Sequence, residues 1–422
     1  MQPHLSRFGH KMSQLTGVRA IMKDIIETMR SGGQWVNLSP GNPLILPEVE
    51  AMWRQYTAKL LASKDFGEVV GRYGASQGYG PLIDAVVEFF NSTYKWGISA
   101  ENVLITPGSQ ALYFYAANTF GGYDPHGRLR KILLPLSPDY TGYGGVALTE
   151  ESLLALKPNI DVTGPHRFKY RPDFDSLKVD DTIGAVLFSR PANPTGNVLT
   201  DDEVRAIVQV AASEEVPVFI DSAYAAPFPD LVYTDMTPIY APNVIHCMSL
   251  SKAGLPGERV GIAIGAAPYI EALESFQTNA AIHSSRFGQA LAAEAIRSGD
   301  LLRLSQTVIN PFYRRKAELL TAAFEEHLPA DLPWFLHEAE GAIFAWLWLD
   351  QLPITDQELY QRIKAHHVFV VPGAPFFPGL KEEWPHKRQC LRISLTATED
   401  ELRIGAAVIG QVLTEVYAGS SR

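Results

Sequence analysis

A regular alternation of short apolar runs with amphipathic stretches, between residues 102 and 265, constrains the fold of this chain more than any other feature. Short apolar runs are typical of buried strands, and the amphipathic stretches between them are typical of helices. One such stretch, 201–215, begins after Thr200, with Glu203 placed to complete a capping box. The alternation predicts an α/β fold, with a largely parallel sheet covered by helices on both faces. The predicted strands are 103–105, 132–134, 185–188, 216–220, 244–248 and 260–264.

Both ends of the chain show a different pattern, in which helical and strand-like segments mix without a regular order. Because 422 residues are too many for one compact core, this change of pattern indicates a second domain. We predict a large domain over residues 46–295 and a smaller α+β domain built from residues 1–45 and 296–422. The segments behind this prediction are helical at 18–30 and 314–326 and strand-like at 342–349 and 368–371.

Charge and cysteine usage narrow the class of protein. The formal net charge is −10 and no basic stripe occurs, which argues against a nucleic-acid partner, because phosphate binding needs clustered Lys and Arg. Residues 1–11 lack the apolar core of a signal peptide, and no apolar run is long enough to cross a membrane. Cys247 and Cys390 could form a disulfide, but such sparse use of cysteine favours a reducing compartment. We therefore expect a cytoplasmic protein and, since no His/Cys cluster has ligand spacing, no metal site.

Lys252 is an unusual residue near the end of an apolar run. It follows the 244–248 run and the hydroxyl residues Ser249 and Ser251, whereas lysine is rarely buried without a reason. From these residues alone, two interpretations are open. The side chain could reach water from the end of a strand, as lysines often do. Alternatively, it could be a Schiff-base lysine, whose amine must lie in a shielded pocket to lose its proton easily.

Polar residues also follow two other predicted strands. Asp221 stands at the C-terminal end of the 216–220 run, at the edge of an open α/β sheet where ligands bind. A carboxylate there can pair with a protonated pyridine nitrogen, and Tyr224 can donate to a phenolate oxygen on the same ring. The alternative for Asp221 is a helix cap. Asn193 lies in a turn that contains proline and glycine, one helix and one strand before Asp221.

The helix that follows the first predicted strand begins with the features of a phosphate site. Gly108 permits a close approach of the backbone, and the free N–H groups at a helix start favour an anion. Ser249 could add a hydroxyl and Arg259 a guanidinium to the same phosphate. The alternative for Arg259 is an ion pair with its neighbour Glu258. Each feature is weak alone, but their order and spacing along one predicted sheet edge indicate a single site.

Together these residues resemble the class I aminotransferases of fold type I, over essentially the whole chain. The resemblance implies a three-layer α/β/α large domain with a mainly parallel sheet, and a smaller α+β domain. It also implies a homodimer and pyridoxal 5′-phosphate as cofactor, held as an imine by Lys252. Lys252, Asp221 and Tyr224 take the positions of catalytic residues. The positions that match the family pattern are Gly108, Ser109, Gln110, Tyr140, Asn193, Asp221, Tyr224, Ser249, Lys252, Arg259 and Arg392.

The resemblance assigns further roles by position. Tyr140 matches an aromatic residue that stacks on the cofactor ring, and Asn193 matches a residue that binds cofactor and substrate. Arg392 matches the arginine that binds the substrate α-carboxylate with a bidentate fork. Tyr73 resembles a tyrosine that reaches the phosphate of the neighbouring subunit. Gly41 resembles a glycine whose backbone lies against the substrate.

A narrower resemblance, to the valine–pyruvate aminotransferases, implies the substrates. These are L-valine or L-alanine as donors and pyruvate or 2-oxoisovalerate as acceptors, in a ping-pong reaction. Arg286 departs from this pattern, because a valine enzyme needs little charge there. It could pair with the acidic side chain of a substrate bound in the neighbouring subunit, or it could be an ordinary interface residue. The segments that carry the resemblance are 193–198, 248–252, 254–257, 340–344, 376–380 and 384–386.

Rival functions are either left open or disfavoured by the sequence. A pyridoxal-phosphate-dependent β-lyase, or an aminotransferase for another amino acid, would carry nearly the same cofactor residues, so both stay open. A non-enzymatic sensor domain of this fold would need an attached DNA-binding segment, and no basic helix-turn-helix pattern precedes residue 45. A Rossmann dehydrogenase is disfavoured because no G-x-G-x-x-G motif follows the first predicted strand.

Overall fold

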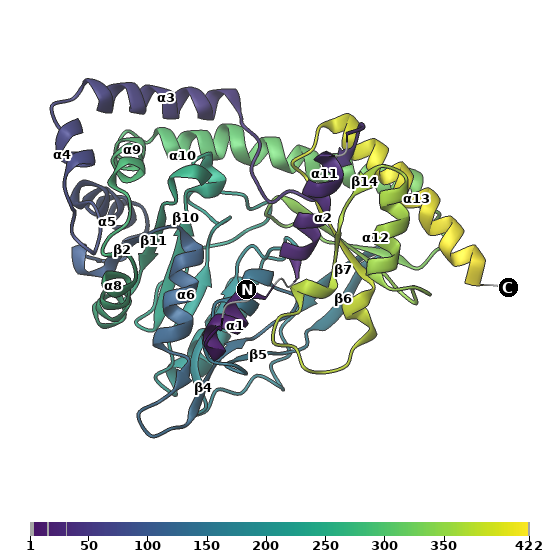
Figure 1. Ribbon diagram of the computed structural model, residues 1–422, viewed down its shortest axis with the longest axis horizontal. Coiled ribbons are helices and arrows are strands. Elements are labelled where there is room, and N and C mark those ends of the chain that lie inside the picture. The colour runs from purple at the N-terminus through teal and green to yellow at the C-terminus, as the bar shows by residue number, and fades with distance from the viewer. Residues whose placement is uncertain (1–3, 15–16, 31, 421–422) are drawn as a thin grey trace.

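Two β-sheets lying side by side organise the protein (Figure 1). The computed structural model describes residues 4–14, 17–30 and 32–420. The strands of the first sheet are β2 (Val103–Thr106), β3 (Gly122–Tyr123), β4 (Leu129–Leu134), β5 (Leu153–Ala155), β8 (Ile183–Ser189), β9 (Val218–Asp221), β10 (Val244–Ser249) and β11 (Gly261–Ile264). They run in the order β2-β11-β10-β9-β8-β4-β3, with β5 beside β4.

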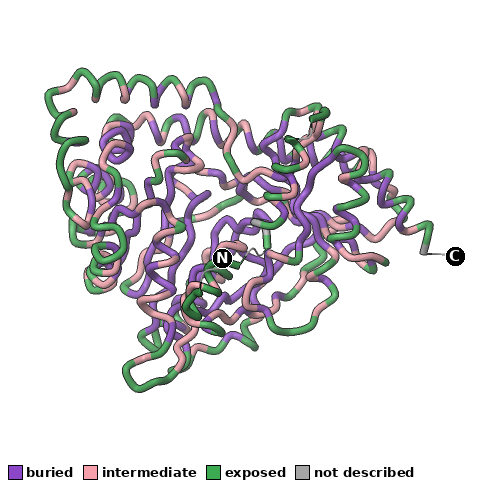
Figure 2. The backbone as a smooth tube through the Cα atoms, in the orientation of Figure 1, coloured by how far each residue is buried: buried purple, intermediate pink, exposed green. Residues whose placement is uncertain are grey.

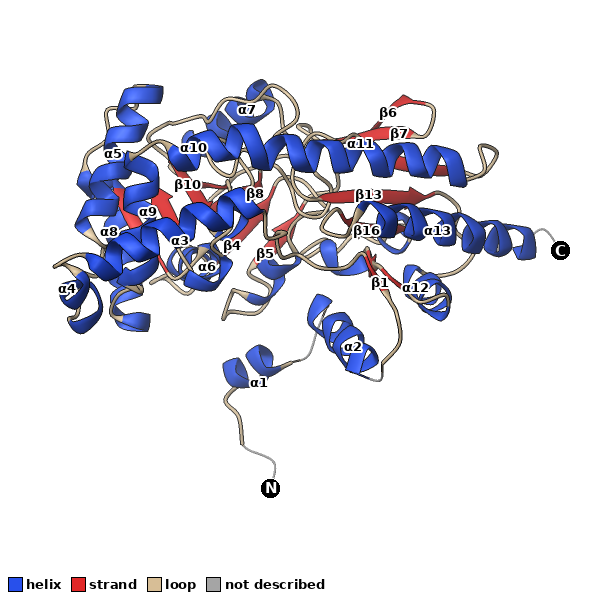
Figure 3. Cartoon of the chain, turned by 90° about the horizontal axis from the view of Figure 1, so that it is seen from above, coloured by secondary structure: helices blue, strands red, loops and turns tan. Residues whose placement is uncertain are grey.

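Parallel pairing predominates in the first sheet. Strands β5, β4, β8, β9 and β10 pair in parallel, whereas β11 is antiparallel to both β10 and β2. Every residue of β2, β8, β9 and β10 is buried, which explains why these strands form continuous apolar runs in the sequence. Helices α6 (Ser109–Thr119) and α7 (Asp201–Ala212) lie on opposite sides of the sheet (Figure 3). The predicted α/β fold is therefore confirmed.

The second sheet combines the C-terminal part of the chain with a hairpin from the middle of the sequence. Its strands are β6 (Asn159–Gly164), β7 (Arg167–Arg171), β12 (Trp334–His337), β13 (Phe344–Leu349), β15 (Val371–Pro372) and β16 (Cys390–Ser394). They run in the order β15-β16-β13-β12-β7-β6, and β7 pairs in parallel with β12. The β6–β7 hairpin belongs to the range 46–295 of the predicted large domain, yet it pairs with the second sheet. The division into two domains otherwise stays a prediction.

The N-terminal segment packs against elements from the C-terminal part of the chain. β1 (Val36–Asn37) pairs in parallel with β14 (Val368–Phe369). Asp24, on α2 (Val18–Arg30), accepts a hydrogen bond of 2.7 Å from the Tyr360 hydroxyl and pairs with Lys364. Both of these partners lie on α12 (Asp356–Ala365). Helix α2 and strand β1 thus lie beside C-terminal elements, whereas Lys11 of α1 donates to the carbonyl oxygens of Ala147 and Thr149, just before β5 of the first sheet.

Helices cover the sheets, and the outer faces of these helices are exposed to solvent. Buried backbone concentrates in the strands, and outer helices such as α3 (Pro47–Ala62) are largely exposed (Figure 2). None of the described helices is long and apolar enough to cross a membrane. The remaining helices are α1 (Arg7–Ser13), α4 (Phe66–Gly71), α5 (Gly80–Tyr94), α8 (Ala267–Ala281), α9 (Arg286–Arg297), α10 (Asp300–Leu304), α11 (Asn310–His327) and α13 (Glu399–Ser420).

Some predicted element boundaries differ from the observed ones. The capping box at Thr200 is confirmed, because its side chain accepts a hydrogen bond from the Glu203 N–H, but the helix ends at residue 212 instead of 215. The prediction of one strand over 368–371 is wrong. The chain changes sheet at Val370, so that β14 pairs with β1 and β15 pairs with β16. All four of these residues are buried, and the local pattern therefore gave no sign of the change.

Candidate active site

A cleft of about 540 Å³ opens at the carboxyl ends of the parallel strands, and Arg392 reaches it from the second sheet. It contains most of the residues that the sequence predicted for the site. Gly108 lies next to it, as the residue that precedes α6, whereas Tyr73 does not line it. The predicted residues that line the cleft are Gly41, Ser109, Gln110, Tyr140, Asn193, Asp221, Tyr224, Ser249, Lys252, Arg259 and Arg392.

Strand register brings these residues together. Asp221, the last residue of β9, pairs with Ser189, the last residue of β8. Ser249, at the end of β10, pairs with Gly261 of β11, which in turn pairs with Thr106 at the end of β2. The four parallel strands therefore end at one edge of the sheet. The loops that follow them carry the polar side chains of the cleft, as is usual for ligand sites in open α/β sheets.

Lys252 is partly buried and its amine points into the cleft. Nζ donates a hydrogen bond of 2.6 Å to the carbonyl oxygen of Gly41 and lies 5.7 Å from the ring centre of Tyr224. Burial, reinforced by the charges of Arg392 and Arg259, lowers the pKa of Lys252 to about 8. Because the amine turns into the cleft and is bonded there, this geometry argues against the first interpretation of the sequence, in which the side chain reaches water from a strand end. The second interpretation, an amine poised to lose its proton, fits the cleft.

The charge on Lys252 is expected to destabilise the cofactor-free protein. Because its pKa is about 8 in the folded protein and 10.5 as the reference for an unfolded chain, the unfolded chain binds more protons between these two pH values. The free energy of unfolding therefore rises with pH across this window, and the cost of the buried charge is fully present below pH 8. We expect Lys252→Met to be more stable than wild type at pH 7, by roughly 2 kcal/mol. Urea unfolding of both proteins checks this, and a stability difference that does not shrink towards pH 10 would contradict it.

Asp221 is a buried carboxylate held by two donors. Its Oδ2 accepts a hydrogen bond of 2.8 Å from the Tyr143 hydroxyl, and its Oδ1 accepts one of 3.0 Å from the Ala223 N–H. Burial raises the pKa of Asp221, while the nearby Tyr113 hydroxyl, these two donors and the charge of Lys252 oppose the rise. The Ala223 contact belongs to a turn, so Asp221 does not cap a helix. Tyr143 was not found by the sequence analysis, because it lies in a short helical turn (Thr141–Gly145) without a recognisable pattern.

Arg392 is a buried cation without a carboxylate partner among the described residues. Nη2 donates to the carbonyl oxygen of Ser39 at 2.7 Å, and Nη1 donates to Oδ1 of Asn193 at 3.2 Å. The rings of Phe344 and Phe376 lie 4.2 and 5.0 Å from the guanidinium carbon. Nε is buried, and within the described chain no acceptor reaches it. Burial lowers the pKa of Arg392 to about 10, and the group is therefore well placed to receive an anion.

A second positively charged part of the cleft, around Arg259, lies at the start of α6. Gly108 has φ 83°, and a Cβ at this position would collide with the guanidinium of Arg259. Nη1 of Arg259 donates to the Ser251 hydroxyl at 3.1 Å, and Ser249 donates to the same hydroxyl at 3.0 Å. The alternative that the sequence left open, an ion pair between Arg259 and Glu258, is not formed in the described structure. Backbone N–H groups, two hydroxyls and a guanidinium therefore converge, with Ser251 added to the predicted set.

Aromatic rings form one wall of the cleft. Tyr140 lines it and packs edge-on against Tyr143, with 5.3 Å between ring centres. Tyr224 is buried and packs edge-on against Phe344 at 6.1 Å. Burial raises the pKa of Tyr224, so its hydroxyl keeps its proton and can donate. The predicted stacking role of Tyr140 and the donor role of Tyr224 stay predictions.

Tyr73 and Arg286 lie together on the surface, outside the cleft. Tyr73 is 82% exposed, and its ring lies 5.8 Å from that of His283. The guanidinium of Arg286 lies 5.3 Å from the ring centre of Tyr79, and Nη1 donates to the carbonyl oxygen of Arg72. Neither residue can act in the cleft of its own chain from this position. Their predicted contacts with a neighbouring subunit stay predictions.

Cys247 and Cys390 are both buried free thiols, so the disulfide that the sequence left open is not formed. Over the described ranges, no group of three or more His, Cys, Asp or Glu side chains is placed to hold a metal ion.

Comparison with protein families identifies one match, to the aminotransferases of class I and II, over residues 165–409. Among individual proteins, the chain is 36% identical to the valine–pyruvate aminotransferase of Escherichia coli K12 over 415 residues. That similarity covers 98% of this chain and 99% of the other.

Solved structures agree with the sequence comparison. A putative amino-acid aminotransferase from Psychrobacter arcticum 273-4 superposes with a TM-score of 0.94 at 37% identity, covering 99% of this chain and all of that one. A valine–pyruvate aminotransferase from Salmonella typhimurium LT2 superposes with a TM-score of 0.87 at 34% identity, covering 95% of this chain and 100% of that one.

Proposed function

Because the chain belongs to the family of class I and II aminotransferases, we propose that it moves an amino group between L-valine or L-alanine and a 2-oxo acid, pyruvate or 2-oxoisovalerate. Aminotransferase activity, the fold-type-I architecture and the cofactor pyridoxal 5′-phosphate follow from family membership. Similarity to valine–pyruvate aminotransferase over nearly the whole of both chains supports the substrate pair. The observation that carries the reaction is the meeting of Lys252, Asp221 and Arg392 in one cleft.

The cleft contains groups that fit each part of pyridoxal 5′-phosphate. The Arg259 guanidinium, the Ser251 hydroxyl and the N–H groups at the start of α6 would hold the phosphate. The Asp221 carboxylate would pair with the protonated ring nitrogen, and Tyr140 would cover one face of the ring. When bound there, the cofactor withdraws the electron pair left on the substrate α-carbon when its proton departs.

Residues of this chain bind the substrate carboxylate and move the α-proton. Arg392 binds the substrate carboxylate through Nε, which is otherwise unpartnered, and through a neighbouring nitrogen, while the flanking rings fix its plane. Nζ of Lys252 would take the proton from the substrate α-carbon and give it to the cofactor carbon that is bonded to the substrate nitrogen. With a pKa of about 8, this amine exchanges a proton readily near neutral pH. The Gly41 carbonyl holds the amine close to the substrate in the meantime.

The charges in the cleft favour a substrate with an uncharged side chain. Among the described residues that line the cleft, the cations are Lys252, Arg259 and Arg392, and each has a role that does not involve the substrate side chain. Met22 of α2 adds an apolar side chain to the lining. Arg286 lies outside the cleft of its own chain, so an acidic substrate would depend on a neighbouring subunit. These observations support valine or alanine as the amino donor.

The two half-reactions give a direct test. L-Valine is expected to bleach the visible absorbance of the bound cofactor, and pyruvate is expected to restore it, because the enzyme alternates between two forms. A spectrum that ignores valine but responds to glutamate or aspartate would leave the reaction standing and reject the substrate. Pyruvate and ammonia formed from cystathionine without an oxo-acid acceptor would favour a β-lyase instead.

We further propose that the protein is a cytoplasmic homodimer. Exposed apolar side chains such as Ile45 and Tyr73, which are 80% and 82% exposed, support contacts with a protein partner. The free thiols of both cysteines support a reducing compartment. Light scattering after gel filtration tests the assembly, since a mass of 46.5 kDa would show a monomer. Cell fractionation tests the location.

A further inference from the structure

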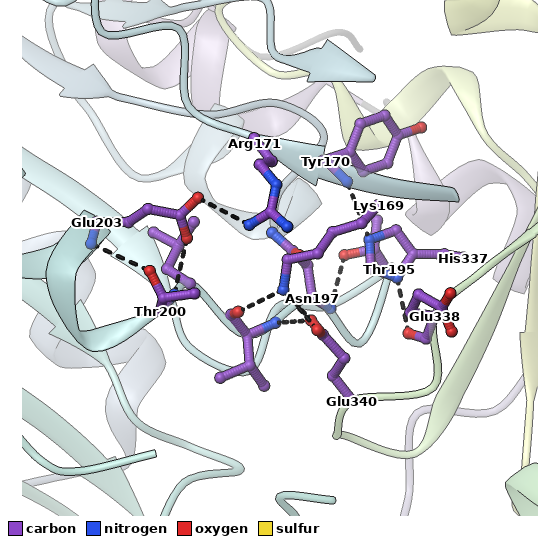
Figure 4. A network of polar contacts seen from close by, with 12 residues as sticks. Lys169, Tyr170, Arg171, Thr195, Asn197, Thr200, Glu203, His337, Glu338 and Glu340 are labelled. Atoms are coloured by element: carbon purple, nitrogen blue, oxygen red, sulfur yellow. Dashed lines mark hydrogen bonds and ion pairs between the residues drawn. The ribbon is translucent and has the colours of Figure 1, made fainter. Parts of the chain in front are cut away.

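A largely buried ion pair joins β7 to the segment before β13, next to the loop that carries Asn193. Lys169, on β7, is only 5% exposed, and its Nζ lies 2.5 Å from both carboxylate oxygens of Glu340. The pair also binds the backbone of one residue in another segment, Val198 (Figure 4). Nζ of Lys169 donates to the carbonyl oxygen of Val198 at 2.8 Å, and Oε2 of Glu340 accepts from the Val198 N–H at 2.9 Å. Both backbone polar groups of Val198 are therefore bound by the pair.

Val198 lies in the loop between β8 and α7, residues 190–200, which also carries Asn193 and is internally braced. The Ala192 N–H donates to the Asn197 carbonyl oxygen at 2.9 Å, and the Gly196 N–H donates to the Ala192 carbonyl oxygen at 2.8 Å. A loop braced in this way moves as a unit, so an anchor at Val198 also fixes Asn193. Asn193 in turn accepts a hydrogen bond of 3.2 Å from Nη1 of Arg392.

Glu340 also begins the segment that leads to the ring over Arg392. The next residue, Gly341, has no room for a side chain, because a Cβ there would lie 2.6 Å from Pro191 and 2.7 Å from the Leu231 carbonyl oxygen. Three residues later, Phe344 places its ring 4.2 Å from the guanidinium of Arg392. The ion pair therefore joins the two segments that contact Arg392 from different sides.

We propose that Lys169 and Glu340 are positioning residues for the substrate carboxylate, acting on Arg392 through Asn193 and Phe344. The inference rests on the carboxylate role proposed for Arg392. A buried pair of this kind is weak evidence for a purely stabilising role, because apolar residues of similar size often stabilise as well. The pair makes two hydrogen bonds to Val198 and is itself held by two more between Lys169 and Glu340, which gives it a geometric function. Loss of either charge frees Val198 and lets Asn193 shift.

The test compares Lys169→Met, Lys169→Arg and Glu340→Gln with wild-type holoenzyme. Arg167→Met is the matched control, because Arg167 lies on the same strand but pairs with Glu325 of α11. Titration calorimetry measures the binding of isovalerate, which has the skeleton of valine but no amino group. Steady-state kinetics with L-valine give kcat and KM. We expect Lys169→Met and Glu340→Gln to weaken isovalerate binding and raise KM by about 10- to 100-fold, with a smaller change in kcat. Lys169→Arg should recover most of the affinity, and Arg167→Met should stay within about twofold of wild type.

Two results would overturn the inference, at different points. If Lys169→Met lowers the melting temperature but leaves isovalerate affinity and KM at wild-type values, the pair is structural only. Arg392→Ala is measured in parallel to test the premise. If that variant binds isovalerate as well as wild type does, the carboxylate site lies elsewhere and the proposed role of Arg392 fails first.

Discussion

Lys252→Ala is expected to abolish amino transfer, with kcat about 10⁴-fold below wild type. Among the residues that the structure describes, no other lysine lines the cleft, and Nζ of Lys252 is held over it by the Gly41 carbonyl oxygen. The variant loses the group that moves the α-proton, and the visible absorbance that depends on a covalent bond between lysine and cofactor should be lost with it. Single-turnover kinetics with L-valine measure the first effect, and the spectrum of the loaded protein measures the second.

Lys252→Arg is the matched control for this experiment. It keeps a positive charge in the cleft, but the guanidinium cannot be deprotonated near neutral pH. If charge alone mattered, this variant would retain activity; we expect it to be as inactive as Lys252→Ala. Near-normal turnover in Lys252→Ala would show that Lys252 is not the catalytic base, because another group would then have to remove the α-proton.

The part of the fold that the sequence predicts well is the part buried on both faces. Strands such as β8 are buried at every position, so they appear as unbroken apolar runs. The β6–β7 hairpin has no such signal, because most of β6 is exposed. Its place in the second sheet is set by the pairing of Arg167 with Leu336, which are 169 residues apart in the sequence. Local periodicity does not contain that information.

The site shows the same division. Asp221 and Lys252 were predictable because each follows a clear strand, and the topology of an open sheet brings such ends together. Tyr143 was not predictable, since its role depends on a hydrogen bond to a residue 78 positions away. The contact between Lys169 and Glu340 spans 171 positions. A hint did exist for Lys169, because it is a lysine between two aromatic residues in a short strand-like stretch.

Asp221→Asn is expected to lower kcat by about 10²- to 10³-fold while leaving cofactor bound. The amide fills the same space beside Tyr143, but it carries no charge to keep a proton on the ring nitrogen of the cofactor. Removal of one preorganised electrostatic contact has an effect of this size in other active sites. Stopped-flow absorbance with L-valine measures the rate, and the cofactor content of the purified protein measures retention.

Tyr143→Phe separates the charge of Asp221 from its hydrogen bond. The Tyr143 hydroxyl stabilises the ionised carboxylate, whose pKa burial already raises, so its removal raises that pKa further. A carboxylate with a higher pKa takes up its proton at a higher pH, and the acidic limb of the pH–rate profile should therefore move to higher pH. At a pH well above that limb, the variant should approach wild-type activity, whereas Asp221→Asn should stay slow at every pH. If Tyr143→Phe were equally slow at every pH, the hydroxyl would have to contact the reacting groups directly, and the acidic limb could not be assigned to Asp221.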